Sequence, residues 1–279
     1  MPLFRGARHL RIALVGLPGS GKSTLFKAVS STAVQTGEFA GTHRAYGECA
    51  VQIGLDEARL VDLPSIHSLH HLQPDDRVAL QYLLWGNDQP PIALHEAGRP
   101  PAPFAPPDVI VHVMDATALE RHLELTLELI QIGRPMVVAL NRMDEAWNKG
   151  LHINAKALST QLGVPVVATV AHMGHGIAEL FNAAANAVRA GACPLPQPAN
   201  AQLCASLQPL SRALNRPELR TAFRIPHPFL LIQLAAGDSY ILDELQMHFP
   251  VIYTQLMQLR ALAEEQLPRR LEEELQADR

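Results

Sequence analysis

The chain has 279 residues, of which 48% are hydrophobic and 18% charged, and its formal net charge is −4. This length allows one sizeable core and a smaller second domain. The Lys and Arg residues are scattered rather than clustered, which argues against the basic surface typical of nucleic-acid binding, so no nucleic-acid partner is expected. The three cysteines have neither metal-ligand nor redox spacing, as is typical of reduced cytosolic proteins.

The N-terminal segment is basic, but its apolar run continues directly into a glycine-rich loop. A signal peptide is therefore not expected, because its cleavage would destroy that loop. No stretch reaches about 18 uninterrupted apolar residues, the length needed to cross a bilayer. We expect a cytoplasmic chain that does not itself span a membrane.

Residues 16–24 read GLPGSGKST and follow the apolar run 12–15. This matches G-x-x-x-x-G-K-[ST], the phosphate-binding loop that joins a strand to a helix. In such a loop Lys22 would neutralise phosphate charge and Ser23 would bind Mg²⁺, while Asp62, at the end of a later strand, would hold a water on that ion. The expected nucleotide-binding residues here are Gly16, Leu17, Pro18, Gly19, Ser20, Gly21, Lys22, Ser23 and Thr24.

Short β-branched runs alternate with segments of helical periodicity through the first two thirds of the chain. The expected strands are 11–15, 48–53, 59–63, 109–114, 136–140 and 164–170. The expected helices are 119–130, 155–162 and 177–188, together with a helix directly after the phosphate loop. This alternation predicts an α/β fold with a mostly parallel sheet, helices on both faces, and ligand loops at the carboxyl ends of the strands.

Two proline-rich stretches interrupt this alternation. Residues 86–107 have no periodic apolar face and predict a long exposed loop. Residues 192–202 predict a linker, and the segments after it all look helical. These expected helices are 203–214, 229–235, 239–247 and a long 251–277. We expect one domain over residues 1–194, with an insertion at 86–107, and a small all-helical domain over residues 195–279.

The segment ALNRMD contains an Asn-x-x-Asp pair, Asn141 and Asp144, after a predicted strand. Such a pair suits guanine, because Asp144 can accept hydrogen bonds from N1–H and the 2-amino group, and adenine lacks both donors. By itself the tetrapeptide is common and would indicate a surface turn, but behind a phosphate loop the guanine interpretation is favoured. Arg142 lies in the same loop, and Val170 and Ala171 fit the loop whose backbone amide contacts the guanine oxygen.

Several segments resemble the cytosolic G-protein region of the FeoB ferrous-iron transporters, as an atypical member. They are IALVGLPGSGKSTLF, VDLPSIHSL, DDRVALQYLL, VHVMDATALERHLELTLELIQIGRPMVVALNRMDEA, LSTQLGVPVVATVA and GHGIAEL, between residues 12 and 180. The segment PHPFLLIQLAAGD and the helical tail are similar to the family's small helical domain. The resemblance implies a P-loop GTPase that binds GTP or GDP with Mg²⁺ and regulates Fe²⁺ uptake.

The resemblance also implies a partner, a polytopic membrane iron-transport domain of the same or an associated chain. The chain would then lie at the inner face of the cell membrane. Whether it forms a homo-oligomer is left open.

Three departures from the family's pattern bear on the site. The family usually has Asn-Pro-Asn where this chain has Leu17-Pro18-Gly19, and the second asparagine helps to bind an activating K⁺, which Gly19 cannot do. The usual DLPG ends here in Ser65, whose backbone amide should still meet the γ-phosphate but has less conformational freedom than glycine. The segment GEFAGTHRAYG, residues 37–47, resembles the family's G-x-W-P-G-V-T region but is about two residues shorter, and Thr42 is the only candidate there for the Mg²⁺-binding threonine.

The expected metal ligands are therefore Ser23, Thr42 and Asp62, and the expected catalytic residues are Lys22, Ser23 and Thr42. Ile66 occupies the position where some G proteins carry a glutamine that orients the attacking water, which predicts slow hydrolysis. The alternative is a nucleotide-gated interaction module with little or no turnover. An RNA-associated GTPase is disfavoured by the absence of a basic patch.

His67, His70 and His71 follow Asp62 at a spacing that could place three imidazoles on one helical turn for metal binding. The simpler interpretation is a solvated switch segment with no acidic or cysteine partner nearby, and we favour it.

Overall fold

The structure, a computed structural model, describes residues 10–30, 35–38, 45–54, 56–69, 74–85, 106–191, 193–194 and 200–278. These residues divide into two compact units. The first contains the described residues up to 194, and the second contains residues 200–278.

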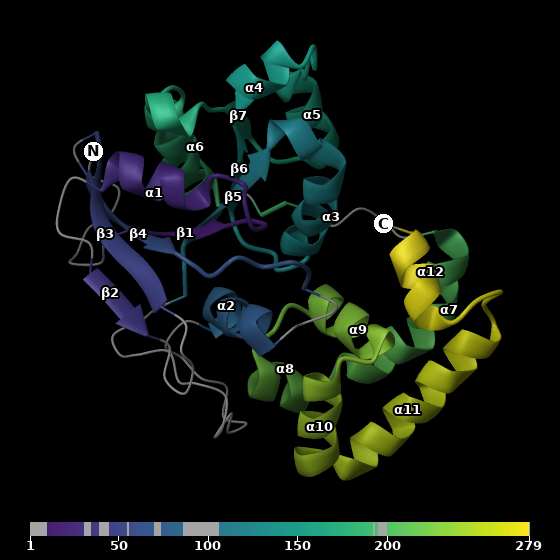
Figure 1. Cartoon of the computed structure of the whole chain (residues 1–279). Coiled ribbons are helices and arrows are strands. Elements are labelled where there is room, and N and C mark those ends of the chain that lie inside the picture. The colour runs from purple at the N-terminus through teal and green to yellow at the C-terminus, as the bar shows by residue number, and fades with distance from the viewer. Residues whose placement is uncertain are drawn as a thin grey trace. The chain divides into compact units, whose positions relative to one another are not determined.

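A seven-stranded sheet with the order β2-β3-β4-β1-β5-β6-β7 forms the centre of the first unit (Figure 1). The strands are β1 (Leu10–Val15), β2 (Gln35–Glu38), β3 (Ala45–Ile53), β4 (Asp56–Asp62), β5 (Val109–Asp115), β6 (Met136–Asn141) and β7 (Val166–Ala168). All neighbours from β4 to β7 pair in parallel, whereas β3 runs antiparallel to both β2 and β4. The predicted mostly parallel sheet is confirmed, and β2 was not predicted.

Helices cover both faces of this sheet (Figure 1). On one face α1 (Lys22–Val29) and α6 (Ile177–Ala190) share a hydrophobic core with alternate residues of β1, such as Ile12 and Leu14. On the other face α3 (Leu119–Ile130) packs against β5. Every residue of β5 is buried because a central parallel strand is covered on both sides.

Further helices and two short 3₁₀ turns complete the first unit. They are α2 (Pro74–Trp85), α4 (Met143–Asn148), α5 (Ala155–Leu162) and the 3₁₀ turns η1 (Ala116–Ala118) and η2 (Ala171–Met173). Neither α2 nor α4 was predicted, and the predicted strand 164–170 is shorter, as β7. The predicted loop 86–107 lies outside the described residues except for its last two.

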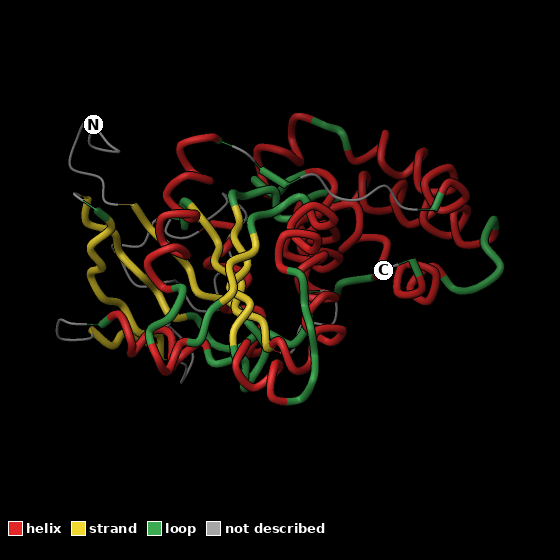
Figure 2. Tube along the Cα trace, turned by 90° about the horizontal axis from the view of Figure 1, so that it is seen from above, coloured by secondary structure: helices red, strands yellow, loops and turns green. Residues whose placement is uncertain are grey.

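The second unit is built from helices (Figure 2). They are α7 (Ala201–Leu214), α8 (Pro217–Phe223), α9 (His227–Ala236), α10 (Ser239–His248), α11 (Pro250–Glu265) and α12 (Leu271–Ala277). The prediction of one long helix over 251–277 is wrong, because the chain leaves the helix between α11 and α12. Pro268 lies in this break, where it has no N–H to donate and disfavours the helical conformation of the residue before it.

Within the described part of the chain, no helix combines the length and apolar character required for a membrane span.

Candidate nucleotide site

The phosphate loop connects the end of β1 to the start of α1, as the sequence predicts. Gly19 and Gly21 adopt left-handed backbone conformations, with φ of 80° and 89°. A Cβ on Gly21 would clash with the Asn141 side chain, and a Cβ on Gly16 would lie 2.6 Å from the carbonyl oxygen of Val113. Glycine is therefore required at both of these positions, because the loop passes so close to two other strands.

Lys22, Ser23 and Asp62 come together beside this loop. The Lys22 ammonium forms an ion pair with the Asp62 carboxylate, and the Ser23 hydroxyl donates a hydrogen bond to the same carboxylate at 3.3 Å. They meet because β1 and β4 are parallel neighbours, with Leu14 paired to Asp62, so both strands end at the same edge of the sheet. The result is a cluster of one ammonium group, one hydroxyl and one carboxylate.

The chain after Asp62 runs along the phosphate loop. We call residues 63–69 the switch segment. The backbone N–H of Leu63 donates to the Leu14 carbonyl at 3.3 Å, and the N–H of Ile66 donates to the Gly16 carbonyl at 3.2 Å. Ser65, predicted to meet the γ-phosphate through its amide, is therefore held close to the phosphate loop by its neighbour.

Thr42 and the three histidines that follow Asp62 were considered as possible metal ligands. Thr42, His70 and His71 lie outside the described residues. His67 is exposed and lies in an irregular segment, and not on the helical turn of the metal-binding alternative that the sequence analysis disfavoured. The expectation of no acidic partner is wrong, because Asp76 of α2 lies 3.4 Å from the His67 ring nitrogen Nδ1. Across the described ranges there is no group of three or more metal-ligating His, Cys, Asp or Glu residues.

Asn141, at the end of β6, links two loops of the candidate base site. Its side-chain nitrogen donates to the Ser20 carbonyl at 3.1 Å, and its side-chain oxygen accepts from the Ala171 backbone N–H at 3.0 Å. The Thr169 hydroxyl lies 3.4 Å from the same oxygen. Asn141 is almost completely buried, so this one amide fixes the phosphate loop relative to the loop that contains Val170 and Ala171.

Asp144, in the first turn of α4, presents an unused acceptor. Its Oδ1 is buried and has no hydrogen-bond partner in the described part of the protein. Its Oδ2 lies 3.7 Å from Nε2 of His172. A buried carboxylate oxygen without a partner is costly unless a ligand supplies the missing donor. The structure therefore contains an acceptor suited to a ligand N–H at the position that the sequence predicts for guanine.

Arg142 is positioned by a residue that the sequence analysis missed. Arg142 has a left-handed backbone, with φ of 61°, and its guanidinium lies 3.0 Å from Oδ2 of Asp115 at the end of β5. The other carboxylate oxygen of Asp115 accepts from the backbone N–H of Thr117 at 2.8 Å. The available signal was an acidic residue directly after a buried strand, in VIVHVMDAT.

Two buried histidines lie between β5 and α3, behind Asp115. His112 is fully buried, with Nδ1 3.0 Å from the hydroxyl of Thr126, and its ring centroid lies 6.3 Å from that of His122. Burial lowers the pKa of His112 to about 3, and it also lowers the pKa of His122. Both imidazoles are therefore neutral at physiological pH, and the sequence patterns gave no sign of them.

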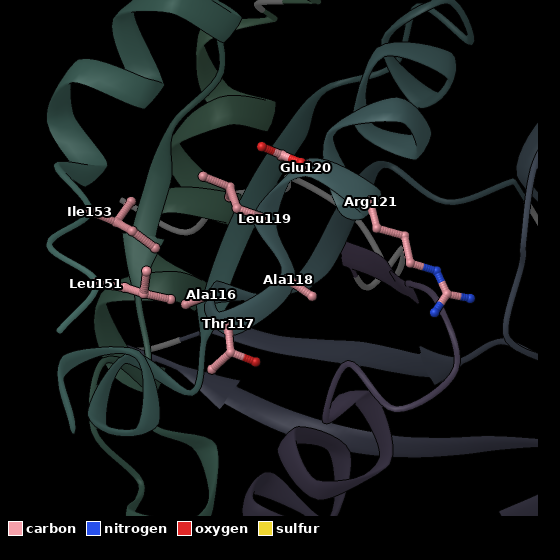
Figure 3. Close-up of a pocket in the computed structure, with 8 residues that line it drawn as sticks. All are labelled: Ala116, Thr117, Ala118, Leu119, Glu120, Arg121, Leu151 and Ile153. Atoms are coloured by element: carbon pink, nitrogen blue, oxygen red, sulfur yellow. The ribbon is translucent and has the colours of Figure 1, made fainter. Parts of the chain in front are cut away.

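A pocket of about 480 Å³ adjoins the loop after Asp115 (Figure 3). Its lining residues are Ala116, Thr117, Ala118, Leu119, Glu120, Arg121, Leu151 and Ile153. The lining is mainly apolar and includes none of the predicted phosphate-binding residues. This pocket is therefore not the phosphate site.

The sequence of this chain is similar to those of known proteins. A family model described as Ferrous iron transport protein B (FeoB_N) matches residues 10–99 and 104–184. The Fe(2+) transport protein A/Fe(2+) transporter FeoB fusion protein of Porphyromonas gingivalis is 30% identical over 233 residues, which are 82% of this chain and 25% of that protein. The chain thus spans about a quarter of the length of this relative.

Two solved structures are similar over almost their whole length. The cytosolic domain of L. pneumophila FeoB is 26% identical, with a TM-score of 0.74 and coverage of 96% of this chain and 94% of that chain. A variant of S. thermophilus NFeoB bound to GDP and AlF4⁻ is 28% identical, with a TM-score of 0.76 and coverage of 96% of each chain. The predicted P-loop GTPase fold followed by C-terminal helices is confirmed by these matches.

Proposed function

Because this chain belongs to the Ferrous iron transport protein B family, we propose that it is a guanine-nucleotide-binding domain that hydrolyses GTP slowly and regulates a ferrous-iron transporter. The first unit, with residues 1–194, would be the GTPase domain, and residues 195–279 would be a helical domain. The proposed partner is a polytopic membrane iron-transport domain of the same or an associated chain, and the proposed location is the cytoplasmic face of the membrane. Homo-oligomerisation stays open.

The buried Oδ1 of Asp144, which has no partner among the described residues, carries the guanine assignment. It lies three residues after Asn141, whose amide holds the phosphate loop and the Ala171 loop together. Guanine offers the two adjacent donors, N1–H and the 2-amino group, that a carboxylate can accept. Adenine offers neither in this arrangement, so a site built around Asp144 favours guanine.

The residues around Lys22 fit a nucleotide-bound Mg²⁺. The Ser23 hydroxyl and the Asp62 carboxylate are oxygen donors, which Mg²⁺ prefers, and they already lie 3.3 Å apart. Bound Mg²⁺ would neutralise charge on the β- and γ-phosphates. Lys22 would supply a second positive charge there, and the loop amides, including that of Ser65, would orient the phosphates. Thr42 is proposed as a further Mg²⁺ ligand.

Slow hydrolysis is proposed because no obvious residue orients the attacking water. Ile66 is fully buried and apolar at the position where some G proteins carry glutamine. The second candidate function, a module that binds GTP and GDP with little turnover, is favoured by the same observation. Single-turnover hydrolysis of GTP by the chain, in the presence of Mg²⁺, separates the two.

Calorimetric titration with GDP and with ADP tests the central assignment. We expect GDP to bind at least 100-fold more tightly than ADP, about 2.7 kcal/mol, because ADP leaves the buried Asp144 oxygen without a donor. Equal affinities for the two nucleotides would contradict the guanine assignment. Tight GDP binding without single-turnover hydrolysis would support the interaction module instead.

A further inference from the structure

The far end of the switch segment is held by a buried carboxylate on α3. The backbone N–H of Leu69 donates to Oε2 of Glu128 at 2.6 Å, and the hydroxyl of Ser68 donates to Oε1 at 2.9 Å. Glu128 is 2% exposed. Both oxygens of one side chain therefore hold two consecutive residues of a segment about sixty positions away in the sequence.

Such a contact is strong and directional. Hydrogen bonds to an ionised acceptor are shorter and stronger than those between neutral groups, and two of them from one planar group also fix an orientation. Leu69 and Ile66 are fully buried, so packing supports the same placement. Breaking these two hydrogen bonds would also cost free energy, because a buried carboxylate would then be left without hydrogen-bond donors.

The near end of the segment has a different kind of anchor. Leu63 and Ile66 donate backbone hydrogen bonds to the Leu14 and Gly16 carbonyls at 3.3 and 3.2 Å. The backbone N–H and the ring Nδ1 of His67 both lie 3.4 Å from Oδ1 of Asp76. These contacts are longer than the 2.6 and 2.9 Å hydrogen bonds to Glu128, so the segment is held less tightly beside the phosphate loop than at Glu128.

We propose that Glu128 is a positioning residue for γ-phosphate recognition: it fixes Ser68 and Leu69, so that only residues 63–67 adjust when the phosphate arrives. This inference builds on the proposed guanine-nucleotide function. Glu128 itself does not contact nucleotide. It acts through the switch segment, whose amide at Ser65 is the group proposed to meet the γ-phosphate.

A purely structural role for Glu128 makes a different prediction. GDP has no γ-phosphate, so its affinity depends on the phosphate loop and the base loops but not on the placement of the switch segment. A residue that positions this segment should therefore affect a GTP analogue and spare GDP. A residue that only stabilises the fold should affect both nucleotides equally.

The Glu128→Gln variant of the whole chain tests this difference. The amide keeps the side-chain size and one acceptor oxygen, but it places an NH₂ group opposite a donor. We expect the Kd for GMPPNP to rise at least fivefold while the Kd for GDP changes less than twofold. Glu124→Gln is the matched control, because Glu124 is exposed one turn earlier on α3, and both affinities should stay unchanged.

Equal losses for the two nucleotides, or no loss for either, would overturn the proposal. If Glu128→Gln does not fold, Ser68→Ala decides by the same comparison, because it removes only one of the two hydrogen bonds. Hydrogen exchange separates this test from the guanine assignment. In protein without nucleotide, Glu128→Gln should speed exchange of the Leu69 amide, and unchanged exchange would overturn the positioning role even if no guanine nucleotide bound.

Discussion

The proposed preference for guanine depends on one side chain, that of Asp144. Replacing it by Asn turns one acceptor oxygen into a donor, which suits the 2-oxo group of xanthine and opposes the 2-amino group of guanine. We expect Asp144→Asn to weaken GDP binding by about 2–3 kcal/mol, the range for lost hydrogen bonds to a charged group, and to improve binding of xanthosine diphosphate. Calorimetry with both nucleotides measures the shift.

Glu145→Gln is a suitable control for this experiment. Glu145 is the next residue, but its side chain is exposed, and its ion pair with Arg142 is long, at 3.9 Å. Its substitution should leave both affinities unchanged. If Asp144→Asn keeps the GDP preference of the unmodified chain, the base does not contact Asp144.

Gly19 occupies the position where the resemblance to the family implies an asparagine that helps to bind K⁺. Because glycine supplies no side-chain oxygen, we expect GTP turnover in KCl and in NaCl, at equal ionic strength, to differ less than about threefold, under about 1 kcal/mol of barrier. A larger stimulation by K⁺ would show that another oxygen has taken this role.

Gly19→Asn is the complementary variant. A Cβ at Gly19 would meet nothing within 4 Å, and among non-glycine residues Asn best tolerates its φ of 80°. We expect the variant to fold and to gain a response to K⁺. The same turnover measurement in the two salts checks it.

At the scale of elements, the layer between β5 and α3 makes stability depend on pH. Burial holds the pKa of His112 at about 3, whereas an unfolded chain has a histidine pKa of about 6.5. The folded state therefore stays neutral here while the unfolded state takes up a proton below about pH 6.5. Above about pH 6.5 this histidine does not change the free energy of unfolding. As the pH falls from there towards 3, the free energy of unfolding decreases by at most about 1.4 kcal/mol per pH unit.

Urea unfolding at pH 7.5 and pH 5.5 measures this dependence. We expect the chain to be less stable at pH 5.5, and His112→Asn to reduce the difference between the two pH values. His122 has a lowered pKa as well, so part of the dependence should persist in that variant. A difference that His112→Asn leaves unchanged would assign it to other groups.

The elements that the sequence predicted well are those with local signals. The predicted bounds of α3 and α5 agree with the structure. In α5 the Asn154 side chain accepts from the Ala157 N–H at the start, and Gly163 adopts a left-handed conformation at the end. The phosphate loop was predictable for the same reason, because contiguous residues define its geometry.

The parts that the sequence did not predict depend on neighbours distant in the chain. Asp115 and Glu128 become important only because β5 lies beside β6 and α3 lies beside the switch segment. No spacing within the sequence indicates such a contact. The short elements β2 and α4 have too few residues for a periodic pattern, and α2 has a weak one.

At the scale of the whole molecule, the candidate site belongs to one unit. Every described residue proposed to contact nucleotide lies in the first compact unit, which ends before residue 196. We therefore expect a chain of residues 1–194 to bind GDP within about threefold of the whole chain, about 0.7 kcal/mol. Calorimetry on both chains, after circular dichroism has shown that the shorter one folds, is the measurement.

Residues 195–279 alone serve as the control and should not bind GDP. If the folded 1–194 chain binds much more weakly than the whole chain, the helical unit contributes to the nucleotide site. The proposed division of labour between the two units would then be wrong.

The position of β1 has a consequence for how the protein is made. This first strand lies between β4 and β5, with Leu10 paired to Ala58 and Ile12 paired to Val109. During synthesis it emerges long before either neighbour, and pairings so distant in sequence form slowly. The phosphate loop follows directly after this strand and is also bonded by Asn141 at the end of β6, so we expect it to become fixed only after β5 and β6 have left the ribosome. A growing chain shorter than that should lack affinity for nucleotide, and nucleotide binding would then favour completion of the sheet.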